Sequence, residues 1–217
     1  MKLPAIAAKS FNQYQNHPVY RSIFQQTLNQ LRQIFSPIAR AKTVHAKIEE
    51  HLKKNLSDPV VAKHISCKKG CTACCHTQVS ISHDEAELLS NKILSGTIKI
   101  DIDRLAHQAQ AADDSTKWYK LDYQSRQCVF LDSEGSCSVY ADRPSVCRSN
   151  YSISDASFCS TEDGVEKPHR LLNTHHSNMV LTAGYYAAKG GGALPHLIWN
   201  KITSKFDKKS RSNENNP

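Results

Sequence analysis

The sequence predicts a mainly α-helical protein with short strands and loops, formed as a single domain organised around a cysteine-bound metal centre. Three observations lead to this prediction. Apolar residues recur at helical spacing on both sides of the chain's middle third. The βαβ alternation typical of a parallel sheet is missing. All eight cysteines of the 217-residue chain lie between positions 67 and 159, and thiolates crowded together repel one another unless a metal or a disulfide neutralises them.

The first third of the chain predicts two helices. Residues 1–16 are polar, and we expect them to be irregular. Apolar residues from Val19 to Phe35 form one stripe of an amphipathic helix, and a second helical pattern runs from Ile38 to Leu52 after the break at Ser36-Pro37. We therefore expect residues 17–66 to form a helical hairpin that packs on the core.

The middle segment, residues 67–160, carries the cysteines on short elements. Residues 77–81 alternate in the manner of a strand. Ser82 to Glu85 has the form of a capping box, which opens a helix that ends near Gly96. A further helix is expected from about Asp101 to Asp114, followed by a short buried strand at 128–131 and a return strand at 136–140.

Residues 161–203 are expected to form the C-terminal helices. A long helical pattern runs from about His169 to Lys189 and ends at the glycines 190–192, which we interpret as a helix terminator. A short terminal helix includes Leu197, Ile198 and Trp199. Residues 204–217 are rich in lysine and are predicted to form a disordered basic tail.

The composition is that of a globular domain with a low content of hydrophobic residues, and a metal centre would add to the stability of its core. Hydrophobic residues make up 39% and aromatic residues 7% of the chain, and formation of a metal site adds directly to folding free energy. The net charge of +8 comes partly from the tail, where Phe206 is the one aromatic residue among the basic ones, which is too few for the interleaved stacking that nucleic-acid binding favours. No apolar stretch approaches the roughly 18 residues of a membrane span, so we expect no membrane contact and a cytoplasmic location.

The cysteines fall into two groups of four. The first is compact, because Cys67-x3-Cys71-x2-Cys74 is followed directly by Cys75, and Gly70 permits the tight turn that wraps these thiols around one centre. Adjacent cysteines point in different directions, so one of the last two could face a second centre or remain a buried thiol. The second group is sparse and suits successive loops; it consists of Cys128, Cys137, Cys147 and Cys159.

These spacings favour an iron–sulfur cluster, most plausibly of the 4Fe-4S type, slightly over Zn²⁺. Zinc ribbons bring two C-x2-C pairs to one tetrahedral ion, and only Cys71 and Cys74 have that spacing here. Iron–sulfur clusters accept more varied spacings of cysteine thiolates. Positive or polar side chains near the cysteines are candidates for supporting contacts to sulfur; these are Lys68, Lys69, Arg143, Arg148 and His76, the last also a candidate extra ligand.

The pattern of the cysteines and their neighbours resembles a known family. The motifs that carry the resemblance are the four clustered cysteines, Cys128-Val-Phe-Leu131, Gly135-Ser-Cys137-Ser-Val-Tyr140 and Arg143-Pro-Ser-Val-Cys147-Arg148. They resemble the YkgJ-type cysteine-cluster family, which is named for its CxxCxxCC motif and described as a zinc- or iron-chelating domain. The resemblance spans roughly residues 67–160, with Cys159 as the eighth cysteine, and implies metal ions as the binding partner.

Two other function classes remain open at this point. Some relatives with similar motifs are flagellin lysine N-methylases, so the resemblance also implies a cluster-dependent methyltransferase that uses S-adenosylmethionine. The even number of cysteines equally suits a thiol-redox or disulfide-stapled protein. The spacing Cys67-x3-Cys71-x2-Cys74 also occurs in radical S-adenosylmethionine enzymes, but Ala73 stands where those enzymes have an aromatic residue. We favour a non-catalytic metal-binding protein with a structural, sensing or metal-handling role.

Overall fold

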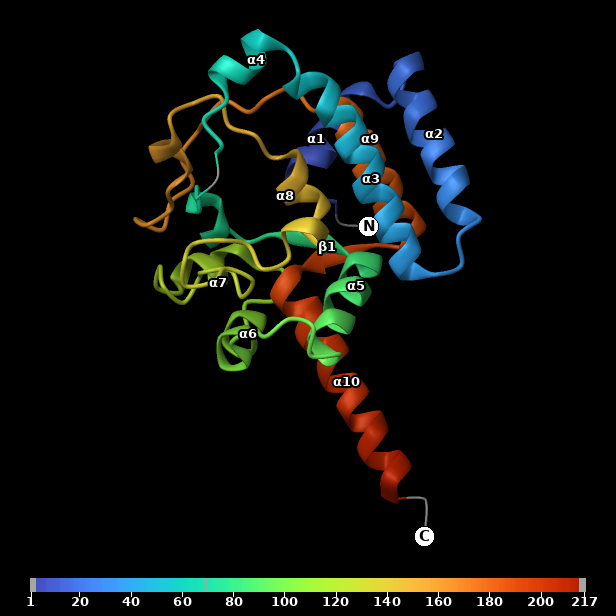
Figure 1. Ribbon diagram of the computed structural model, residues 1–217, viewed down its shortest axis with the longest axis vertical. Coiled ribbons are helices and arrows are strands. Elements are labelled where there is room, and N and C mark those ends of the chain that lie inside the picture. The colour runs from blue at the N-terminus through green and yellow to red at the C-terminus, as the bar shows by residue number, and fades with distance from the viewer. Residues whose placement is uncertain (1–2, 69, 215–217) are drawn as a thin grey trace.

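Helix α9 (His175–Ala187) forms the centre of the helical part of the molecule. The computed structural model describes residues 3–68 and 70–214. Residues 177–185 of α9 are buried on every side of the helix, as expected for a helix that is surrounded by protein. Helices α1 (Ala5–Tyr14), α2 (Pro18–Arg32) and α3 (Pro37–Leu56) all pack against it, and together they enclose one hydrophobic core (Figure 1).

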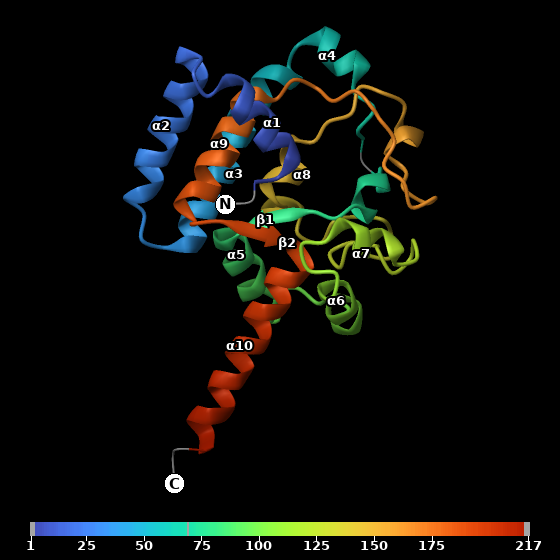
Figure 2. The ribbon, with the colours of Figure 1, turned by 180° about the vertical axis from the view of Figure 1, so that it is seen from behind.

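A second hydrophobic core lies around helix α5 (His83–Leu94). Helix α10 (Leu194–Glu214) packs against both α5 and α6 (Ile102–Ala109). The buried side chains of this core include Ile81, Leu89, Leu105, Val129, Phe130 and Ile198. The end of α10 projects away from the body of the molecule (Figures 1 and 2).

Two short strands join these two cores. Strand β1 (Ser80–Ser82) pairs antiparallel with β2 (Gly191–Ala193), with Ile81 opposite Gly192 (Figure 2). Each strand leads directly into a helix, because β1 is followed by α5 and β2 by α10. The pair therefore fixes the starting points of both helices relative to the end of α9.

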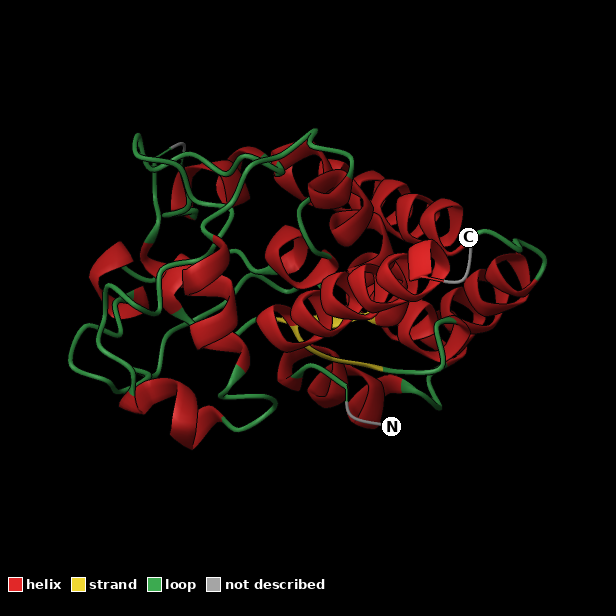
Figure 3. Cartoon of the chain, turned by 90° about the horizontal axis from the view of Figure 1, so that it is seen from below, coloured by secondary structure: helices red, strands yellow, loops and turns green. Residues whose placement is uncertain are grey.

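The cysteine-containing region lies beside the helices and consists mostly of loops (Figure 3). Within the described residues, the loops that carry the cysteines contain short elements, namely α7 (Ser115–Lys120), α8 (Ser145–Ser149) and the 3₁₀ turns η1 (Ala73–His76), η2 (Tyr140–Asp142) and η3 (Ala156–Cys159), and α4 (Pro59–His64) precedes them. A region with so little regular structure depends on side-chain contacts or cross-links for its order.

The predominantly helical fold class predicted from the sequence is confirmed, and so is the capping box. The Ser82 hydroxyl accepts from the Glu85 backbone N–H at 3.2 Å, and the Glu85 carboxylate accepts from the Ser82 N–H at 2.8 Å. The helices expected over 17–66 are present as α2 and α3, with α4 in addition. They pack on α9, which is distant in sequence.

Several expected elements differ from those observed. Helix α1 occupies residues expected to be irregular, and its apolar side chains join the first core. Helix α10 continues to Glu214, through most of the segment expected to be a disordered tail; residues 215–217 lie outside the described residues. Helix α9 begins at His175, later than expected, and residues 169–174 precede it without helical structure.

The two strands expected at 128–131 and 136–140 are also not formed. One isolated bridge between Leu131 and Cys137 replaces them, because the chain turns tightly: the Leu131 N–H donates to the Cys128 carbonyl at 2.9 Å. Conversely, Gly191 and Gly192, which were expected only to end a helix, belong to strand β2.

None of the helices in the described segments combines the length and the apolar content that crossing a bilayer requires.

Candidate metal centre

The fold brings together cysteines from both groups. All eight are described as free thiols; Cys74 is exposed and the other seven are partly buried. The first group lies on the loop before η1 and on η1 itself, and the later cysteines lie on the 128–137 turn, on α8 and on η3. The 3₁₀ turns η1 and η3, which carry Cys74 and Cys159, are in contact.

Ser152 connects Cys67 to Cys159. Its backbone N–H donates to the Cys67 Sγ at 3.2 Å, and its carbonyl accepts from the Ser66 N–H at 2.9 Å. Burial raises the pKa of the Cys159 thiol, and a hydrogen bond with the Ser152 side chain opposes that rise. Ser152 was not among the predicted site residues, because it stands among other serines with no distinguishing spacing.

Cys75 connects the first group to Cys128. The Cys128 N–H donates to the Cys75 carbonyl at 2.8 Å. The turn that begins at Cys128 then brings Cys137 back beside it through the Leu131–Cys137 bridge. Both cysteines pack against the second hydrophobic core, which fixes their backbone in place.

The pKa values of the thiols reflect their mutual proximity. Burial, together with the nearby Cys137 and Cys74, raises the pKa of Cys128 to about 11. Burial also raises the pKa of Cys147, with added contributions from Cys74, Cys128 and Cys137. A hydrogen bond with the Cys75 thiol is the main cause of the raised pKa of Cys74. These thiols therefore hold their protons at neutral pH unless a cation compensates the charge.

Arg143 is placed to provide part of that compensation. Its guanidinium lowers the pKa of three thiols, those of Cys74, Cys137 and Cys147, against the effects that raise them. The guanidinium lies 4.4 Å from the centroid of the Tyr140 ring. Its Nε atom is buried and has no hydrogen-bond partner among the described residues. An unpaired cationic donor beside several thiols fits an anionic thiolate centre.

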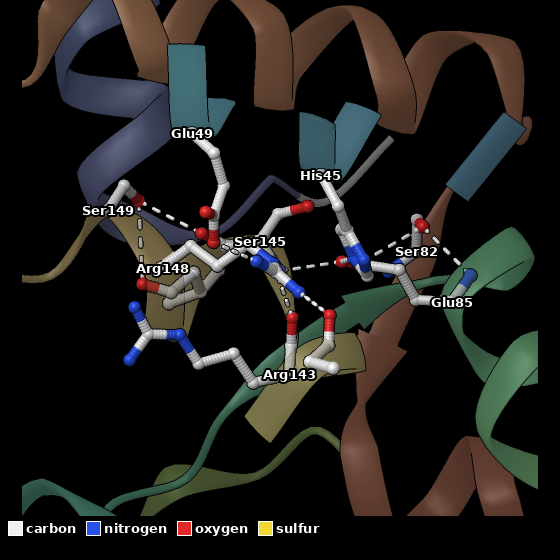
Figure 4. A network of polar contacts seen from close by, with 10 residues as sticks. His45, Glu49, Ser82, Glu85, Arg143, Ser145, Arg148 and Ser149 are labelled. Atoms are coloured by element: carbon white, nitrogen blue, oxygen red, sulfur yellow. Dashed lines mark hydrogen bonds and ion pairs between the residues drawn. The ribbon is translucent and has the colours of Figure 1, made fainter. Parts of the chain in front are cut away.

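A buried polar network holds α8, the helix that carries Cys147 (Figure 4). The Arg148 side chain pairs with Glu49 of α3 and donates to the carbonyls of Ala141 and Arg143. The Glu85 carboxylate accepts from the Ser145 N–H at 2.6 Å and lies 3.0 Å from the His45 Nε2. Arg148, predicted as a donor to sulfur, thus uses its donors mainly to fasten α8 to α3.

His76 is buried and its contacts are with the neighbouring aromatic residues. Its ring stacks on Tyr123 with centroids 3.9 Å apart, its Nδ1 lies 3.0 Å from the Tyr123 carbonyl, and its own carbonyl accepts from Trp118. These contacts explain its place in the fold, and a ligand role for it stays a prediction. Lys68 is exposed, and Lys69 lies outside the described residues.

The sulfur atoms gather without forming a closed coordination shell. Within the described residues, no three Cys, His, Asp or Glu side chains are arranged to hold a single ion as they stand. Rotation about one cysteine χ1 angle moves its sulfur by roughly 3 Å, which is enough to draw neighbouring thiols toward a common centre. The donor set and the flanking Arg143 fit a metal centre that completes its shell when the metal binds.

A pocket of about 250 Å³ reaches this region from the surface. Its lining includes Cys74 and Cys159 together with Phe158 and Glu166. A larger hollow of about 740 Å³ lies between α3 and the side chains of Tyr140, Arg143 and Tyr151. The smaller pocket gives an ion a direct path to two of the thiols.

Comparison with known proteins finds a family model that matches this region. Residues 66–168 match the model of the CxxCxxCC family, whose description reads "Putative zinc- or iron-chelating domain". The match covers just under half of the chain and confirms the resemblance inferred from the motifs. No curated protein and no solved structure matches the chain. Neither the family description nor the described residues support the methyltransferase or thiol-redox alternatives.

Proposed function

We propose that the CxxCxxCC domain formed by residues 66–168 binds zinc or iron through its eight cysteine thiolates. The observation that carries this proposal is the meeting of thiols from two distant stretches of chain, with Cys74 close to cysteines of both. The proposed ligands are Cys67, Cys71, Cys74, Cys75, Cys128, Cys137, Cys147 and Cys159.

The arrangement of the thiols favours iron–sulfur clusters over single zinc ions. Zinc–sulfur bonds of about 2.3 Å hold the four sulfurs of a tetrahedral site roughly 4 Å apart. A 4Fe-4S cluster has an iron at each of four corners and separates its thiolates by roughly 6 Å. What supports the cluster is the varied spacing of the eight cysteines along the sequence, which iron–sulfur sites accept and paired zinc motifs do not show.

A structural role for this centre follows from where its ligands lie. The cysteines occupy loops and short turns beside the helices (Figure 3), a region where thiolate–metal bonds would replace the missing regular structure. Bonds between loops far apart in sequence contribute folding free energy directly. Free thiols in this number also require reducing surroundings, in keeping with the expected cytoplasmic location.

Metal analysis of protein purified without oxygen tests the proposal. We expect bound iron with an equal amount of acid-labile sulfide. We also expect a broad absorption at about 400 nm, typical of 4Fe-4S clusters, that dithionite bleaches. Colourless protein with stoichiometric zinc would keep the metal-binding function and replace the cluster by zinc.

A variant in which all eight cysteines are replaced by alanine is the matched control, and it should bind no metal. Folded wild-type protein that contains neither iron nor zinc, and takes up neither when reconstituted, would refute the proposed function.

A further inference from the structure

The six cysteines other than Cys74 and Cys75 separate into two groups of three according to their hydrogen bonds and their neighbouring residues. We define the outer trio as Cys67, Cys71 and Cys159, and the inner trio as Cys128, Cys137 and Cys147. The two trios cut across the order of the chain, because Cys159, the last cysteine in sequence, belongs with the first two.

The outer trio is assembled around Ser152 and the turn at Gly70. Ser152 hydrogen-bonds both to Cys67, through its N–H at 3.2 Å, and to Cys159, through its side chain. Gly70 has φ of +85°, and the Cys71 N–H donates to the Lys68 carbonyl at 3.0 Å. This turn folds Cys71 back toward Cys67, and Cys71 is also near enough to Cys159 to act on its charge.

The inner trio is assembled on the second hydrophobic core and on α8. The Leu131–Cys137 bridge closes the turn between Cys128 and Cys137, and α8 presents Cys147 to both of them. Arg143 lies beside this trio and acts on the charges of Cys137 and Cys147.

Cys74 and Cys75 stand between the two trios. Both lie on the 3₁₀ turn η1, where successive side chains point about 120° apart. Cys74 is a neighbour of Cys67 and Cys159 on one side and of Cys128 and Cys147 on the other. The Cys75 carbonyl accepts from the Cys128 N–H. Although successive side chains diverge along such a turn, the Cys74 and Cys75 thiols are in hydrogen-bond contact, so one thiol given to each centre would place the two centres next to each other.

We propose that the chain holds two separate four-cysteine metal centres, one completed by the outer trio and one by the inner trio, with Cys74 and Cys75 each giving the fourth ligand to one of them. This inference rests on the metal-binding function proposed above. It specifies which thiols share a metal and why two cysteines stand next to each other.

Metal counting on alanine variants tests the division into two centres. Wild-type protein and two triple variants, Cys67→Ala/Cys71→Ala/Cys159→Ala and Cys128→Ala/Cys137→Ala/Cys147→Ala, are measured by native mass spectrometry and elemental analysis. We expect each triple variant to keep half of the wild-type metal, a twofold loss, whichever metal is bound. The combined sextuple variant should keep none.

The single variants Cys74→Ala and Cys75→Ala provide an independent measurement, and each should also show a twofold loss. A triple variant that keeps all of the metal, or none of it, while its helical circular dichroism is intact would overturn the proposal. If the inner triple variant does not fold, the outer triple and the two single variants decide in the same way. Wild-type protein without any metal would instead contradict the proposed function itself, so the two failures are distinguishable.

Discussion

Glu85 is an ionisable residue that is almost completely removed from solvent. Its carboxylate is buried and accepts hydrogen bonds from the backbone N–H groups of Ser82 and Ser145, with the His45 ring 3.0 Å away. Burial disfavours its charge, but the contacts with His45 and the two N–H groups outweigh burial and lower the pKa of Glu85 to about 2. The charged carboxylate therefore stabilises the junction of α3, α5 and α8.

Replacing this carboxylate by an amide should remove a pH-dependent part of the stability. Because the folded-state pKa lies below the ordinary value of 4.5, the contribution is complete above that value and is lost as the pH falls toward about 2. We expect Glu85→Gln to lower the free energy of unfolding by about 3 kcal/mol at neutral pH, with the difference from wild type shrinking in acid. Urea unfolding of both proteins across this pH range measures it.

Glu87→Gln on the same helix is the control, since that carboxylate is partly exposed and pairs with Lys201 and Lys205. It should cost less than about 1 kcal/mol. A Glu85→Gln protein whose stability deficit is constant with pH would show that the charge of Glu85 does not stabilise the fold.

Among the elements, the pair β1–β2 depends on a glycine whose role the sequence did not reveal. A Cβ atom on Gly191 would lie 2.2 Å from the Ile81 carbonyl oxygen and 2.9 Å from the Ser82 Cα. Both are backbone atoms of the neighbouring strand and cannot rotate away. The run of glycines at 190–192 therefore permits a close approach between strands as well as the end of α9.

Gly191→Ala should separate the two strands and lower the free energy of unfolding by about 3 kcal/mol or more. Gly192→Ala is the matched control, because its added Cβ would meet the Asp113 carboxylate at 2.9 Å, a side chain that can shift; we expect a cost of about 1 kcal/mol. Urea unfolding compares the two variants. Equal effects of both substitutions would contradict the importance of the backbone contact.

Elements were predictable from the sequence where their own residues determine them. The apolar stripes of α2 and α3 and the capping box of α5 are local patterns, and they gave the correct helices. The prediction of strands at 128–140 was wrong because apolar residues such as Val129 and Phe130 are buried there in a turn. Helix α1 was missed because it is short, has no side-chain cap and contains alanines among its apolar residues, and its order comes from packing against α9.

At the scale of the whole molecule, the chain combines a helical part with large apolar cores and a loop region that is held by polar contacts and thiols. The sequence identified the candidate thiols, since their residue type and spacing are local information. It could not identify the partners of each thiol, because the contacts of Ser152 with Cys67 and Cys159 form only in the tertiary structure. The same contacts place Cys159 beside the first group of cysteines. Arg143 was predicted beside the cysteines, and it does lower the pKa of three of them.

This division predicts that removal of the proposed metal loosens the loop region of the molecule and leaves the helical part unchanged. Helices α2, α3 and α9 share a core formed by buried apolar side chains, so they should keep their protection from hydrogen exchange in chelator-treated, reduced protein. Peptides from 67–75 and 128–160 should exchange at least about tenfold faster, which corresponds to about 1.4 kcal/mol of lost local stability. Mass-spectrometric hydrogen exchange with and without chelator measures both parts at once.

The protein that lacks all eight cysteines separates metal loss from other effects of the chelator, because the chelator should not change its exchange pattern. Faster exchange spread evenly over both parts would mean that the metal stabilises the fold as one cooperative unit. Unchanged exchange at 67–75 and 128–160 would mean that the loops keep their order through contacts such as Ser152 to Cys67 and Arg148 to Glu49 alone. The first outcome would contradict the separation into two parts, and the second would contradict a structural role for the metal.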